Sequence, residues 1–70
     1  MDDETATRLL LGLIEKYLDT DSRDKAVLHL NELGCAPEVV KFILAEIVKN
    51  DTKLSPEDAL NYRKLVVEFI

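Results

Sequence analysis

The chain of 70 residues has room for one small domain, and a domain of this size encloses only a thin hydrophobic core. Its 14 acidic residues outnumber 9 basic ones and leave a formal charge of −5, whereas nucleic-acid-binding modules usually carry a basic stripe. The composition therefore argues against direct nucleic-acid binding and favours a protein partner with a basic surface.

One cysteine, Cys35, is too few for an internal disulfide bond, and such usage is typical of a reducing compartment. No apolar run approaches the roughly 18 residues that a membrane-spanning helix needs. The start Met-Asp-Asp-Glu lacks the basic region of a signal peptide. We therefore expect a soluble, cytoplasmic chain that does not bind a membrane.

Two helices are predicted in the first half of the chain. Residues 4–19 place their apolar side chains on one arc with helical periodicity. A second helix over residues 22–33 follows an N-cap at Asp21 or Ser22. Its predicted buried stripe consists of Ala26, Leu30 and Leu33. Gly34 follows, and glycine most easily takes the left-handed conformation that ends many helices.

A third helix is predicted over residues 37–49 and forms the centre of the domain. Pro37 stands in its first turn, where the missing N–H costs nothing. Branched aliphatic side chains fill one broad arc of this helix: Val39, Val40, Ile43, Leu44, Ile47 and Val48. Because this arc is so wide, we expect the other helices to pack around this one.

The fourth helix, over residues 56–70, has the clearest start signal. Ser55 is the predicted N-cap, Pro56 occupies the first turn, and Asp58 replaces the usual Glu of a capping box. Its predicted stripe contains Ala59, Tyr62, Val66, Phe69 and Ile70, with Leu60, Leu65 and Val67 on the flanks. This face is wider than one neighbouring helix covers.

Two interpretations of that wide face remain open. Either the fourth helix lies in the middle of a bundle, or it forms a seam for a second copy or for a missing half-domain. In the second case we expect the self-association residues to be Val66, Val67, Phe69 and Ile70. In both cases the sequence predicts an all-α fold for residues 1–70, with four antiparallel helices arranged as two hairpins.

Side chains that support catalysis or bind metals are sparse. His29 and Cys35 are the only histidine and cysteine, so no His/Cys metal cluster can form. A nucleophilic pair of these two residues lacks an orienting group and an oxyanion loop. We therefore expect a binding protein without enzymatic activity, metal or cofactor.

Two large apolar residues interrupt charged helix faces. Leu28 lies near Asp24 on the helical wheel, and Phe42 lies near Glu38. One interpretation is that each covers a groove between helices. The other is an exposed patch that anchors a partner through both apolar side chains, with Asp21, Asp24 and Glu38 attracting its basic groups.

A loose pattern across residues 13–48 resembles the MA-three domain family, a helical module of translation-initiation scaffolds. The matching positions are Ile14-Glu15-Lys16-Tyr17-Leu18, Ala26, Asn31-Glu32-Leu33 and Pro37. Ser22 and Lys25 depart from this pattern, and the family's later helices have no counterpart, so none of its functional residues is transferred. The resemblance implies HEAT-like helical hairpins and a protein-binding role, with the translation-initiation DEAD-box helicase as the partner.

Overall fold

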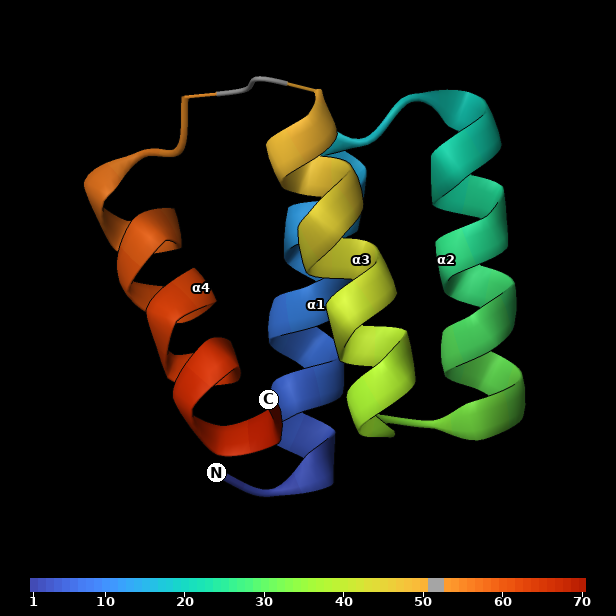
Figure 1. Cartoon of the computed structure of the whole chain (residues 1–70), viewed down its shortest axis with the longest axis horizontal. Helices are drawn as coiled ribbons and strands as arrows, with labels where there is room; N and C mark the ends of the chain where they lie inside the picture. The colour runs from blue at the N-terminus through green and yellow to red at the C-terminus, as the bar shows by residue number, and fades with distance from the viewer. Residues whose placement is uncertain (51–52) are drawn as a thin grey trace.

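The computed structural model describes residues 1–50 and 53–70, and within these ranges all regular structure is helical. The elements are α1 (Asp3–Tyr17), α2 (Thr20–Leu33), α3 (Pro37–Lys49) and α4 (Pro56–Phe69) (Figure 1). The predicted all-α class is therefore confirmed. No helix in the described part of the chain has the length and apolar character needed to cross a membrane.

The turn between α1 and α2 differs from the prediction. α1 ends at Tyr17 rather than at residue 19, and α2 begins at Thr20 rather than at residue 22. The N-cap is Asp19, whose Oδ1 accepts a hydrogen bond of 2.9 Å from the backbone N–H of Ser22. The predicted caps Asp21 and Ser22 are wrong because the carboxylate of Asp19 satisfies the exposed N–H groups earlier.

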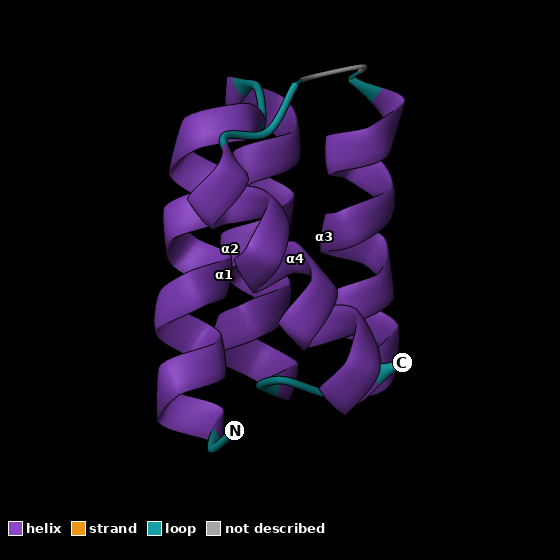
Figure 2. Cartoon of the chain, turned by 90° about the vertical axis from the view of Figure 1, so that its left-hand side faces the viewer, coloured by secondary structure: helices purple, strands orange, loops and turns teal. Residues whose placement is uncertain are grey.

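α1 and α3 form the centre of the molecule, since they contact each other and both remaining helices. α2 covers one side of this pair and α4 covers the other, as Figure 1 shows. Figure 2 shows that α4 runs obliquely across its neighbours. α3 therefore has the central position that its apolar arc predicted.

The core consists of aliphatic side chains from all four helices. Its enclosed residues are Ala6, Leu10, Leu13, Ile14, Leu18, Ala26, Leu30, Val39, Val40, Ile43, Leu44, Ile47 and Leu65. Two residues expected in the core are largely exposed, Leu33 because α2 ends there and Val48 at 64% of its surface. Each of these residues lies at the edge of its apolar arc, where burial depends on whether a neighbouring helix covers that edge.

α4 is rotated relative to its predicted orientation. Leu65, which was expected on the flank, is the fully buried residue of this helix, whereas Ala59 and Ile70 from the predicted stripe are exposed. Tyr62, Val66 and Phe69 are half-buried against the core. Leu60 and Val67 are therefore exposed to solvent on the outer face of α4.

A polar cluster fixes the start of α4 against the end of α1. Ser55 is the N-cap, as predicted, and its Oγ accepts a hydrogen bond from the Asp58 N–H at 3.2 Å. Tyr17 completes the capping box: its hydroxyl accepts from the Ser55 N–H at 3.2 Å and donates to Asp58 Oδ2 at 2.6 Å. The side chain of Asp58 is shorter than the Glu side chain of a usual capping box, and it is linked to the backbone N–H of Ser55 through the hydroxyl of Tyr17.

Lys16 adds a charge to this cluster. Its Nζ lies 2.8 Å from Asp58 Oδ2. The bond from Lys16, followed by those from Tyr17 and Ser55, lowers the pKa of Asp58 from 3.8 to about 2. The same bond to Asp58 raises the pKa of Lys16 above its ordinary value.

Candidate functional site

The outer face of α2 carries three of the five predicted partner-binding residues. Leu28 is 53% exposed and lies opposite the buried stripe formed by Ala26 and Leu30. Asp21 and Asp24 are exposed on the same face. This face of α2 therefore carries one isolated apolar side chain, that of Leu28, bordered by carboxylates.

The other two predicted residues meet at the seam between α2 and α3. Phe42 is half-buried and packs edge-to-face on His29, with ring centroids 5.2 Å apart and planes at 82°. Glu38, Leu33 and Val39 complete the lining of a shallow hollow of about 190 Å³. Phe42 thus covers the seam, and Glu38 supplies a carboxylate at the edge of the hollow.

The predicted site is therefore divided into two adjoining surfaces. Glu38 and Phe42 lie together in the α2/α3 hollow, whereas Asp21, Asp24 and Leu28 lie on the outer face of α2. His29 and Leu33 were not predicted as members of this surface. Only the pairing of α2 with α3 brings them beside Phe42.

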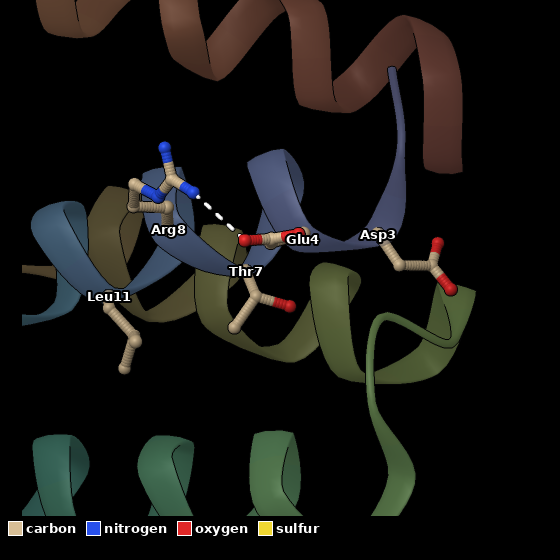
Figure 3. A pocket seen from close by; sticks show the side chains of 5 residues that line it. All are labelled: Asp3, Glu4, Thr7, Arg8 and Leu11. Carbon is tan, nitrogen blue, oxygen red and sulfur yellow. Dashed lines mark hydrogen bonds and ion pairs between the residues drawn. The ribbon is translucent and has the colours of Figure 1, made fainter.

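A larger hollowed surface along α1 and α2 was not predicted. One hollow of about 510 Å³ is lined by Asp3, Glu4, Thr7, Arg8 and Leu11 (Figure 3). A second hollow of about 690 Å³ is lined by Arg8, Leu11, Gly12, Glu15, Arg23, Asp24 and Val27. Because the two share Arg8 and Leu11, we treat them as one surface, the α1/α2 groove.

The charges of the α1/α2 groove are partly paired. Arg8 donates to Glu4 at 3.2 Å, and Figure 3 shows Leu11 directed toward α2 while the Arg8 guanidinium extends away from it. Neither Glu15 nor Asp24 forms an ion pair within residues 1–50 and 53–70. The one sequence signal for this groove was Gly12, a glycine inside a helix that no turn explains.

The predicted self-association residues divide between the inside and the outside of α4. Val66 and Phe69 are half-buried against the core, whereas Val67 is 76% exposed and Ile70 is also exposed. Leu60, which was not among the predicted residues, is more than half exposed on the same face as Val67. The accessible apolar surface of α4 is therefore formed by Leu60, Val67 and Ile70.

Cys35 and His29 belong to different surroundings. Cys35 Sγ lies 3.1 Å from Thr7 Oγ1 and 3.6 Å from the carbonyl oxygen of Asp3, whereas His29 packs against Phe42. In the part of the chain that the structure describes, no three His, Cys, Asp or Glu side chains gather where a metal ion could bind. All polar side-chain atoms buried there have hydrogen-bond partners.

Comparison with known proteins adds no relative: no protein-family model, curated protein or solved structure matches this chain.

Proposed function

We propose that this chain is a protein-interaction module that binds a partner with a basic surface through α2 and the α2/α3 hollow. The main supporting observation is the exposure of Leu28, an apolar side chain with Asp21 and Asp24 on its own helix face. Apolar anchors surrounded by polar residues are the usual arrangement of binding hot spots. Phe42 and Glu38 extend the surface toward α3.

The resemblance to the MA-three family narrows this proposal. On the basis of this resemblance, we propose that the four helices form two HEAT-like hairpins and that the partner is the translation-initiation DEAD-box helicase. In that complex Leu28 and Phe42 are the anchors, and Asp21, Asp24 and Glu38 attract basic groups of the helicase. Since opposite charges steer association, binding should weaken as the salt concentration rises.

An amide-shift titration of the labelled chain with this helicase tests the proposal. We expect the largest shifts around Leu28 and Phe42, and a loss of binding in Leu28→Ser. The matched control is Val48→Ser, which removes another apolar side chain that is more than half exposed, from α3. Equal losses in both variants, or shifts confined to α4, would contradict the proposal.

A second candidate function is self-association through α4. The observation that favours it is the outer face of this helix, where Leu60 and Val67 are each more than half exposed, with the exposed Ile70 directly after the helix end. Apolar side chains at this spacing on one helix face are typical of a helix that packs against another. Mass measurements across a range of concentrations test it, since association depends on concentration.

A further inference from the structure

Gly12 is a glycine that the fold of a single copy does not require. It lies inside α1, and Gly34 is the glycine with positive φ in the described part of the chain. A Cβ atom added to Gly12 meets no atom within 4 Å. Alanine stabilises a helix interior more than glycine does, so the single copy loses stability here without a compensating contact.

The α1/α2 groove combines an apolar floor with four carboxylates, those of Asp3, Glu4, Glu15 and Asp24, and two guanidinium groups. Leu11 and Val27 provide the apolar floor. Glu15 on α1 and Asp24 on α2 provide carboxylates that form no ion pair among the described residues. Two guanidinium groups lie beside them, that of Arg23 and that of Arg8, which is paired with Glu4. A basic helix with apolar knobs is the complement of this surface.

The outer face of α4 has these properties. Leu60 and Val67 lie two helical turns apart on it and are 52% and 76% exposed. Arg63 and Lys64 lie between them along the helix, and neither forms an ion pair in the ranges 1–50 and 53–70. Leu60 and Arg63 also line a shallow hollow with Pro56 and Ala59. α4 therefore offers basic side chains between two exposed apolar ones.

These two surfaces cannot meet within one copy. Figure 3 shows α4 on one side of α1 and α2 on the other. Two α4 helices that packed against each other would also bring Arg63 and Lys64 of both copies together, and like charges at close range repel. The acidic groove of another copy removes that repulsion.

We propose that the α1/α2 groove of one copy receives the outer face of α4 from a second copy. Leu60 and Val67 pack on Leu11 and Val27, and Gly12 lets the incoming helix approach α1 closely. This inference rests on the self-association proposed above and specifies its receiving surface. Because the two surfaces differ, the contact is head-to-tail. An open assembly of any length therefore keeps a free groove at one end and a free α4 at the other, where further copies can bind.

Two variants that block one surface each provide the test. Gly12→Arg fills the groove and repels the basic α4, while the open space at this position lets α1 keep its fold. The double variant Leu60→Glu, Val67→Glu removes the apolar knobs, which are exposed in a single copy. Circular dichroism verifies that both fold. If Gly12→Arg does not fold, Glu15→Lys with Asp24→Lys replaces it.

Sedimentation velocity then measures the mass of each protein and of the mixture. We expect the wild-type mass to rise with concentration beyond that of a dimer, and each variant alone to remain a monomer. Mixed in equal amounts, the variants should form a dimer and nothing larger, because one retains an intact α4 and the other an intact groove. Rising salt should dissociate this dimer.

Two outcomes overturn the inference in different ways. A wild-type chain that stays monomeric at every concentration removes both self-association and the groove as its receptor. If Gly12→Arg still associates while the α4 variant does not, self-association through α4 stands and the groove is not its receptor. Binding of the helicase to α2 is measured separately and is untouched by the first outcome.

A smaller substitution at the same position separates folding from association. Gly12→Ala should raise Tm by about 2–8 °C, since alanine favours the helix and the added methyl group has space. It should also weaken association, because the methyl group occupies the place of the closest helix approach. Unchanged association in this stabilised variant would contradict a close approach at Gly12.

Discussion

α3 and α4 are similar in length, at 13 and 14 residues, and each begins with a proline, yet they are held in different ways. α3 has no side-chain cap, but five of its residues are buried. α4 has the Ser55 cap and the Tyr17–Asp58–Lys16 cluster, but within it only Leu65 is fully buried. Burial therefore stabilises α3, whereas local polar contacts hold the start of α4.

The two helices also differ in how much apolar surface they expose to solvent. α3 directs its apolar arc inward and contacts every other helix, so it has little apolar surface left apart from Val48. α4 contacts α1 and α3 but not α2, and its buried and half-buried apolar residues are Leu65, Tyr62, Val66 and Phe69. Its outer apolar residues are free for another molecule, which is why the self-association proposal falls on α4.

The largest effect is expected from truncation of the α3 core. Ile43→Ala removes a fully buried side chain and should lower the free energy of unfolding by about 2–5 kcal/mol. Chemical denaturation measures the change. In Val48→Ala, on the same helix but exposed, the change should stay within about 0.5 kcal/mol. Equal effects would show that α3 is not the centre of the core.

A somewhat smaller and more local effect is expected in α4. Leu65→Ala should destabilise the protein by about 2–3 kcal/mol, at the low end for buried leucine, because α4 lies at the edge and can partly close the space. Native-state hydrogen exchange should show faster exchange of the α4 amides while α3 remains protected. If α3 and α4 exchange together, the two helices form one cooperative unit and the comparison fails.

Removal of one hydroxyl should affect the start of α4. Tyr17→Phe breaks the contacts to Ser55 N–H and Asp58 and should cost about 1 kcal/mol in unfolding free energy. Tyr62→Phe is the control, because its hydroxyl makes no hydrogen bond in the described ranges and its ring is half-buried too. A larger loss in the Tyr62 variant would contradict the anchoring role of Tyr17.

The smallest effect concerns acid stability. The pKa of Asp58 is about 2 in the folded chain and near 3.8 otherwise, so its contribution is complete above about pH 4 and is lost as pH falls toward 2. Asp58→Asn should therefore lower Tm at neutral pH and reduce the fall in Tm between pH 4 and 2. If Asp58→Asn shows the same fall in Tm between pH 4 and 2 as the unchanged chain, other carboxylates cause that fall.

Local sequence signals predicted the helix starts and stops wherever a single residue decides them. Pro37 and Pro56 begin α3 and α4, Ser55 caps α4, and Gly34 ends α2 with φ of 66°. The prediction was wrong at the turn before α2. Four consecutive residues there, Asp19 to Ser22, can each cap a helix, and local rules do not rank Asp19 above Asp21 and Ser22.

The candidate site was predictable only as a set of exceptions to the helical pattern. Leu28 stood out as apolar on a charged face, and the structure leaves it exposed. Phe42 stood out for the same reason, but α2 packs beside it and half-buries its ring against His29. The wheel of one helix contains no information on which flank its neighbour covers, so it could not distinguish these two residues.

The sequence by itself determined that the chain is helical, where most helices begin, and that α3 lies at the centre, because these features follow from residue type and period. Only the tertiary structure decided how α4 is rotated, with Leu65 inside and Leu60 and Val67 outside. Its apolar residues surround so much of the helix that their periodicity does not single out one rotation. In the observed rotation the Tyr17 hydroxyl contacts Ser55 and Asp58, which lie 38 and 41 positions further along the chain, so no local pattern reveals this contact.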